Sequence, residues 1–251
     1  YRDDPCSCFE LKDDPDYDPS ETMLNMKMHK AISIIQFKIE GQMILSHPDF
    51  GMEDRLLLDK IDKEKGCVTI DGVTYPMKDS NFPTLDPANP YELTAQEQEV
   101  IDQIQQSFIH CEKLQQHIQF MYSHGSLYKV YNGNLLYHGC IPLTKEGDFL
   151  PVQIFGKTYS GRALYDVLDT YARKGYYATD NREKIRGQAI LWYLWENPNS
   201  PVFGKEKMAT FERYFVAEKA LHVEPKNPYY HMLNEEKMAD AVLKEFGLSG
   251  A

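Results

Sequence analysis

The chain has 251 residues, which is enough for one large domain or two small ones with a hydrophobic core. Hydrophobic residues make up 42% of the sequence and charged residues 26%, a composition typical of globular proteins. The formal net charge of −11 argues against a partner that is a nucleic acid, and no apolar run approaches the length of a membrane span. The five cysteines are odd in number and scattered, so they do not indicate a disulfide framework, and we expect a reduced, cytoplasmic environment.

The first part of the chain predicts an acidic turn-rich segment followed by a long helix. Residues 1–19 are rich in Asp and Pro and favour extended, turn-prone backbone. Asp18 has the properties of an N-cap, with Pro19 in the first helical position, and the helix should run to about Glu40 and end at Gly41. Because its apolar residues cover most of the circumference, we expect this helix to be deeply buried.

The next elements are short, except for one long helix. Residues 52–63 predict a short charged helix, and residues 68–75 predict a β-hairpin turning at an Asp-Gly pair. Residues 152–159 repeat the hairpin pattern. Thr94 and Glu97 have the spacing of a capping box, which would open a helix to about residue 124 with one apolar stripe.

The last part of the chain contains three more predicted helices. We expect them at residues 160–173, 183–194 and about 234–246. Since the strands are few and short, the fold class is mixed α/β with helix dominating. We divide the chain into residues 1–125, mainly helical with a β-hairpin at 67–75, and residues 126–251, part of an α/β domain.

The stretch of residues 131–143 (YNGNLLYHGCIPL) is the first candidate for a functional site. Asn132-Gly133 predicts a hairpin turn, and the apolar strand after it reads as buried on both faces. This strand ends at His138-Gly139, where a loop would leave a coordination position open on a metal bound by the imidazole. A purely structural histidine fits the same spacing, and no second ligand lies close in sequence.

A second candidate lies in the loop of residues 196–208. Lys205 and Lys207 stand beside Gly204, and glycine and lysine together can cradle a phosphate. The spacing is not that of a P-loop, which requires GxxxxGK[ST]. A charged surface turn explains the same residues.

Several longer motifs resemble the class III (Firmicutes-type) fructose-1,6-bisphosphatases of bacteria. They occur in the family's order along the whole chain: Asp3-Asp4-Pro5-Cys6, residues 52–62 (MEDRLLLDKID), residues 131–143, residues 192–215 and Asn227-Pro228-Tyr229-Tyr230. The resemblance implies hydrolysis of the 1-phosphate of fructose 1,6-bisphosphate, a step of gluconeogenesis. The expected partner is therefore a small sugar bisphosphate.

The family is itself similar to the calcineurin-like metallophosphatases. That similarity implies a calcineurin-like mixed sheet with extensive helical elaboration, and two divalent ions whose bridging water attacks phosphorus. We expect the metal to be Mn²⁺, and we carry over His138, in the later His-Gly motif, as a ligand. By analogy with the superfamily, Lys205, Lys207 and Arg213 would neutralise the phosphates of the sugar.

The other motifs of the superfamily are absent from the sequence. There is no DxH, GDxxDRG or GNH[DE] motif and no closing GH motif. Family order would put the first three before Tyr1 and the last after Ala251. We therefore expect an interior segment that has no phosphatase activity by itself.

Two other functions remain open at this stage. One is a related metallophosphatase that acts on another phosphomonoester. The other is an assembly module whose Met- and Ile-rich helices pack against a partner chain, and a homo-oligomer is among the open alternatives.

Overall fold

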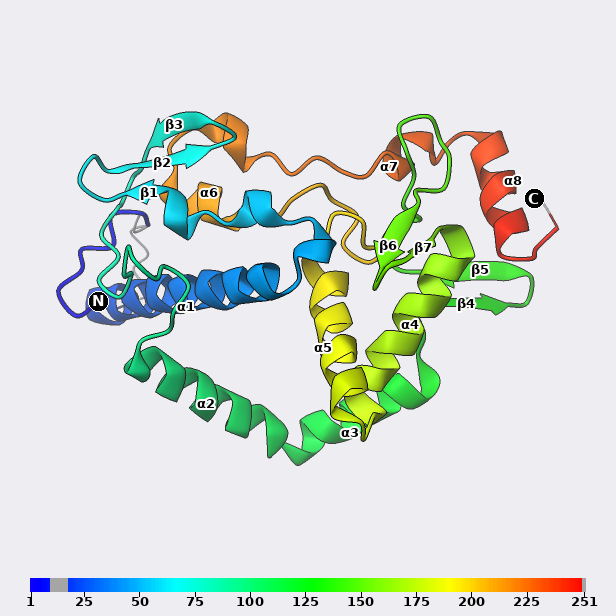
Figure 1. The fold of residues 1–251 in the computed structure, drawn as a ribbon, viewed down its shortest axis with the longest axis horizontal. Helices are drawn as coiled ribbons and strands as arrows, with labels where there is room; N and C mark the ends of the chain where they lie inside the picture. Colours follow the sequence, from blue (N-terminus) through cyan, green and yellow to red (C-terminus); the bar gives the residue numbers. More distant parts are fainter. Residues whose placement is uncertain (10–17, 250–251) are drawn as a thin grey trace. The chain divides into compact units, whose positions relative to one another are not determined.

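A computed structural model describes residues 1–9 and 18–249, and within it the chain forms two compact units (Figure 1). Unit 1 contains Tyr1–Phe108 and Ala209–Val223, and unit 2 contains Ile109–Met208 and Glu224–Ala251. The predicted division into residues 1–125 and 126–251 as parts of a metallophosphatase-like protein stays a prediction. Most of the predicted acidic turn segment, residues 10–17, lies outside the described residues.

Unit 1 is a long helix with a small antiparallel sheet and shorter helices. Its α-helices are α1 (Pro19–Ser46), α2 (Ala95–Ile109, continuing one residue into unit 2) and α6 (Thr210–Phe215). Its 3₁₀ helices are η1 (Pro48–Phe50), η2 (Glu53–Arg55), η3 (Leu58–Lys60) and η4 (Lys219–His222). Its sheet has the order β1-β2-β3, with strands β1 (Ile61–Asp62), β2 (Cys67–Ile70) and β3 (Val73–Pro76).

Unit 2 combines two β-hairpins with five α-helices among its described residues. The hairpins are β4 (Tyr128–Tyr131) with β5 (Asn134–Tyr137), and β6 (Val152–Ile154) with β7 (Lys157–Tyr159). The helices are α3 (Glu112–His124), α4 (Gly161–Tyr177), α5 (Asn181–Glu196), α7 (Tyr229–Met232) and α8 (Glu236–Glu245). Helices α4 and α5 form an antiparallel pair (Figure 1), and the absence of side chains at Gly175 and Gly187 lets their backbones touch.

The mixed α/β class is confirmed, and so are the predicted hairpins. In the first hairpin Ile70 pairs with Val73, and the two turn residues, Asp71 and Gly72, both have positive φ angles, at 51° and 76°. Such a turn matches the right-handed twist of the strands, which explains why an Asp-Gly pair predicts it. The prediction that residues 135–137 are buried on both faces is wrong, because β5 belongs to a two-stranded hairpin and Leu136 is 54% exposed.

Helix α1 begins as predicted but ends later. The Asp18 carboxylate accepts a hydrogen bond from the Ser20 amide at 2.8 Å, which makes Asp18 the N-cap. The predicted stop at Gly41 is wrong: the helix continues to Ser46, and a Cβ at position 41 would lie 2.0 Å from the ring of Tyr91. Gly41 therefore serves close packing, not helix termination. Burial is also less complete than predicted, since Leu24 is 57% exposed.

Two other predicted helices are divided in the structure. Residues 52–63 form η2, η3 and strand β1 in place of one helix. The capping box is confirmed, with the Thr94 amide 2.8 Å from the Glu97 carboxylate and the Glu97 amide 3.2 Å from the Thr94 hydroxyl. The helix that it opens ends at Ile109, because Cys111 has an extended backbone and acts as the N-cap of α3. None of the described helices is both long and apolar enough to span a membrane.

Two buried lysines connect α1 to the rest of unit 1. The Lys30 ammonium lies 2.7 Å from Asp4 and 2.8 Å from Asp79, and all three side chains are almost completely buried. Lys38, also buried, contacts Glu97 at 2.7 Å. A buried charge is tolerated only with a partner that compensates it, so these ion pairs fix where α1 meets the N-terminal residues and the start of α2.

Replacing Lys30 by Met should strongly destabilise unit 1. The change leaves two buried carboxylates without a cation, for which we expect a loss of about 3–5 kcal/mol in the free energy of unfolding. Chemical denaturation followed by circular dichroism measures it. The control is the same substitution at Lys27. The Lys27 ammonium contacts only the Arg2 carbonyl among the described residues.

The same cluster should make stability dependent on pH in acid. Burial alone would raise the pKa of Asp79, but hydrogen bonds from Lys30 and from the amides of Asn81 and Cys8 outweigh it and lower the pKa. The contribution of Asp79 to the free energy of unfolding is therefore complete above about pH 3.9, the pKa of an Asp in the unfolded chain. It is lost as the pH falls through the lower pKa that Asp79 has in the folded protein. Denaturation between neutral pH and about pH 2 should show a larger loss for the wild type than for Lys30→Met.

Candidate functional site

Three loops of unit 2 meet around the residues that the sequence singled out. The first, residues 138–143, follows strand β5; the second, residues 197–205, follows helix α5; and the third, residues 224–228, leads into α7. We call this arrangement the three-loop cluster. Its interior belongs to the core of unit 2, which contains Cys140, Ile141, Leu143, Tyr165 and Tyr229.

The first loop lies directly on the second. Gly139 has a φ of +85°, and a Cβ there would lie 2.2 Å from the Pro201 carbonyl oxygen and 2.8 Å from that of Val202. The Cys140 amide donates to the same Pro201 carbonyl at 2.8 Å. Only glycine permits both this backbone conformation and this approach. The glycine of the His-Gly motif therefore attaches the His138 loop to the loop after α5.

The second loop is held in shape by polar side chains that are fully buried. The Ser200 hydroxyl donates to the Leu194 carbonyl at 2.8 Å and accepts from the Val202 amide at 3.1 Å. The Asn197 carboxamide accepts from the Asn199 amide at 2.9 Å. These bonds satisfy backbone groups that would otherwise be buried without a partner. The loop is thus held by hydrogen bonds from buried side chains.

The third loop is joined to both of the others through Asn227. Its side-chain oxygen accepts from the Leu143 amide at 3.3 Å and from the Tyr229 amide at 3.0 Å. Its own amide donates to the Gly204 carbonyl at 3.1 Å. One buried asparagine therefore fixes the positions of the first and second loops relative to each other.

The imidazole of His138 lies at the surface of this cluster. The residue is exposed, and it follows the last residue of β5 directly. No group of three His, Cys, Asp or Glu side chains that could hold a metal ion occurs anywhere in the two described ranges. His138 is therefore accessible as a ligand, but the described residues do not complete a metal site around it.

The predicted phosphate-binding residues are divided between the two units. The Lys205 ammonium forms an ion pair with Glu224 at 2.7 Å, which neutralises its charge, while Lys207 is partly exposed in the same segment of unit 2. Arg213 belongs to unit 1, where its guanidinium donates to the His222 carbonyl at 3.2 Å. The role of all three residues stays a prediction.

The cluster also contains a cysteine, Cys140, which could be considered as a nucleophile. Burial raises the pKa of its thiol to about 12, so the thiol is protonated at neutral pH. The Tyr165 hydroxyl donates to the Cys140 carbonyl at 2.8 Å, which makes this position part of the packing. A buried, protonated thiol is a poor nucleophile, so this environment does not favour covalent catalysis through Cys140.

Sequence reasoning missed Asn197, Ser200 and Asn227. All three precede a proline, in Asn197-Pro198, Ser200-Pro201 and Asn227-Pro228, and an Asn-Pro or Ser-Pro pair is a recognised turn signal in which the side chain bonds nearby backbone amides. That signal was present in the sequence. The bond from Asn227 to Leu143, across 84 positions, had no local signal.

Substituting Gly139 by Ala should loosen the His138 loop. We expect a loss of about 2 kcal/mol or more in the free energy of unfolding, from the backbone strain together with the clash against Pro201. The matched control is Gly133→Ala, at a φ of +75° where no neighbouring atom lies within 4 Å of the added Cβ. Equal losses for the two variants in urea denaturation would show that the contact contributes nothing beyond backbone strain.

Comparison with known proteins identifies the family. The model of the Firmicute fructose-1,6-bisphosphatase family matches residues 1–251. The chain is 51% identical over 251 residues to the class 3 fructose-1,6-bisphosphatase of Clostridium tetani (strain Massachusetts / E88), and 50% identical over 254 residues to that of Alkaliphilus metalliredigens (strain QYMF). Each match covers 99% of this chain, and the chain spans 38% of the length of these relatives. No solved structure matches. The chain therefore belongs to the Firmicute fructose-1,6-bisphosphatase family.

Proposed function

We propose that the protein hydrolyses the 1-phosphate of fructose 1,6-bisphosphate and releases inorganic phosphate. The observation that carries the proposal is an identity of about half over 99% of the chain to proteins named fructose-1,6-bisphosphatase class 3. Since the chain spans 38% of the length of those relatives, the proposal concerns a protein of their full length that contains this segment. A related phosphomonoester is the alternative substrate.

Within this function, we propose that the three-loop cluster presents charged side chains to the substrate. A sugar bisphosphate carries two dianionic groups, which cations must neutralise before an oxygen nucleophile can approach phosphorus. Lys205 is supported by its side chain, which is 42% exposed beside the hydrogen-bonded second loop, and a phosphate would compete with Glu224 for its ammonium. Lys207 and Arg213 are proposed by analogy alone, as additional phosphate contacts.

We also propose that the reaction requires a divalent metal ion, which we expect to be Mn²⁺, with His138 as one ligand. The exposure of the imidazole supports the ligand role. The described residues around His138 do not fit a complete site, so other ligands have to be supplied from elsewhere. The calcineurin-like fold belongs to the same proposal, because it follows from the resemblance to metallophosphatases, and the cytoplasmic location is proposed from the scattered, unpaired cysteines.

One feature favours an assembly role as a second function of the segment. Helix α3 has no buried residue, and Phe120 and Met121 on it are 63% and 68% exposed. Helix α2 exposes Val100 and Ile104 at 42% and 39%. Exposed apolar side chains on a helix, when they form a patch, are typical of sites that contact another protein.

A chimeric enzyme tests the proposed reaction. The matched segment of the Clostridium tetani relative is replaced by this chain, and phosphate release from fructose 1,6-bisphosphate is measured with and without Mn²⁺. We expect metal-dependent turnover, because the segments are 51% identical throughout. A folded chimera that releases phosphate faster from other sugar phosphates than from fructose 1,6-bisphosphate would favour the alternative substrate.

In that chimera, His138→Ala should reduce turnover by about 100-fold or more if the imidazole is a metal ligand. The matched control is His124→Ala, because His124 is also exposed and is also followed by a glycine. Bound manganese measured by atomic emission should fall in the first variant and stay unchanged in the second. Unchanged metal content and turnover in His138→Ala would contradict the ligand role.

The chain by itself should not turn over fructose 1,6-bisphosphate. The reason is that the described residues contain no group of side chains able to hold a metal ion. A coupled assay for fructose 6-phosphate on the isolated chain, in the presence of Mn²⁺, makes the measurement. Turnover that follows the chain through successive purification steps would contradict this expectation.

A further inference from the structure

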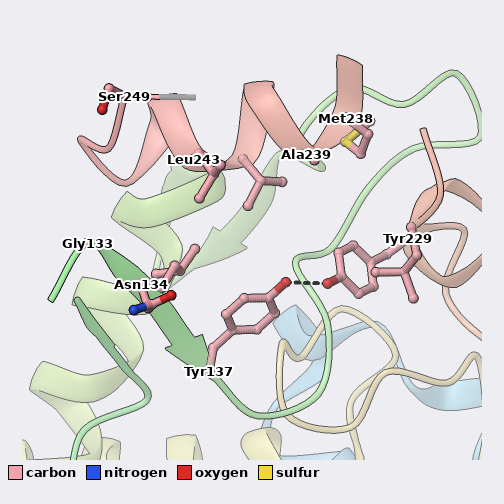
Figure 2. A pocket seen from close by; sticks show the side chains of 11 residues that line it. Gly133, Asn134, Tyr137, Tyr229, Met238, Ala239, Leu243 and Ser249 are labelled. Carbon is pink, nitrogen blue, oxygen red and sulfur yellow. Dashed lines mark hydrogen bonds between the residues drawn. The ribbon is translucent and has the colours of Figure 1, made fainter. Parts of the chain in front are cut away.

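Unit 2 contains a pocket that no predicted site residue lines. It has a volume of about 430 Å³ and lies between strand β5 and helices α7 and α8 (Figure 2). Leu135 and Tyr137 form the strand side, and Ala239, Val242 and Leu243 form the side of α8. A pocket of this volume, mainly lined by apolar side chains, is within the range of sites for small organic molecules.

Two tyrosine hydroxyls supply the polar feature of the pocket. Figure 2 shows the Tyr137 and Tyr229 rings meeting end to end, with a hydrogen bond between their hydroxyls. Each hydroxyl has one proton, and a bond between the two uses only one of them. Neither hydroxyl has another partner among the described residues. One O–H donor is therefore left without an acceptor at the pocket.

The Tyr229 phenol is neutral at physiological pH. Burial, and then the hydrogen bond with Tyr137, raise the pKa of Tyr229 well above its usual value. Tyr229 is 5% exposed and Tyr137 is partly buried, so the free proton points to an acceptor inside the pocket, for which a ligand oxygen would compete with water. A ligand atom that accepts a hydrogen bond would complete the pair, and leaving a buried donor without an acceptor is costly.

Charge decides which ligands fit. Of the described residues that line the pocket, none has a charged side chain. A phosphate ester or carboxylate would lose its hydration there without gaining a cation, so the substrate of the proposed reaction does not fit. A neutral molecule with an apolar body loses little hydration free energy when it enters the pocket.

We propose that this pocket is a binding site for a small, neutral, mainly apolar molecule, whose carbonyl or ether oxygen accepts the free proton of the Tyr137–Tyr229 pair. The site is independent of the proposed hydrolysis. It is nevertheless joined to the three-loop cluster, because Tyr137 directly precedes His138 and the Tyr229 amide bonds Asn227 at 3.0 Å. Occupation of the pocket would therefore act on the loop that presents His138.

The binding test uses 6-propionyl-2-(dimethylamino)naphthalene, a neutral fluorescent ketone whose emission shifts to the blue in apolar surroundings. We expect saturable binding to the wild-type protein with a blue-shifted emission. Ala239→Trp places an indole in the pocket from an exposed position of α8 and should weaken binding by about ten-fold or more. The matched control is Ala241→Trp, on the same helix but not lining the pocket, which should bind as the wild type does.

A second variant tests the hydrogen bond without filling the pocket. Tyr137→Phe/Tyr229→Phe removes both hydroxyls and should weaken binding of the ketone by roughly three- to ten-fold, the effect of one hydrogen bond. The same variant should bind 6-propyl-2-(dimethylamino)naphthalene, which lacks the carbonyl, as tightly as the wild type binds it. If circular dichroism shows that Ala239→Trp does not fold, this measurement still tests whether the ketone binds in the pocket.

Three results would overturn the proposal. The first is the absence of saturable binding to the wild-type protein. The second is equal binding by a folded Ala239→Trp variant and the wild type. The third is a double Phe variant with the wild-type affinity for the ketone, or one whose affinities for the ketone and for its carbonyl-free analogue fall by the same factor.

Discussion

The close approach of Gly139 to the backbone of Pro201 and Val202 is the constraint on which the candidate site depends. No side chain fits between these two loops, and the backbone at Gly139 has a left-handed conformation that other residues adopt only with strain. The backbone of His138, one residue earlier, is therefore held next to the loop that carries Lys205. Asn227 then fixes the third loop to the other two.

The elements that the sequence predicted well are those in which neighbouring residues decide the conformation. An Asp-Gly turn, a capping box and an Asp-Pro helix start each involve atoms within a few residues of one another. Gly41 shows the opposite case. As a local signal it predicts a helix end, but the Tyr91 ring packs where its side chain would be, and the helix continues. A contact between residues 50 positions apart thus overrides the local preference.

The same distinction applies to the candidate site. The His-Gly motif and the loop of Lys205 were visible in the sequence, and the structure places them in contact. The neutralisation of Lys205 by Glu224 was not visible, because the two residues lie in different loops. The exposed apolar residues of α3 were also unexpected, since periodicity defines an apolar face but does not say what covers it.

The burial of Lys30 and Lys38 has a practical consequence for chemical labelling. Both ammonium groups are inaccessible to solvent and held by carboxylates, so an acylating reagent cannot reach them in the folded protein. Surface lysines such as Lys65, whose side chain is 78% exposed, would react at once. Modification at the two buried positions would therefore occur only in molecules that had opened. In a labelled sample, mass spectrometry of these two lysines would record how often unit 1 unfolds, without any denaturant.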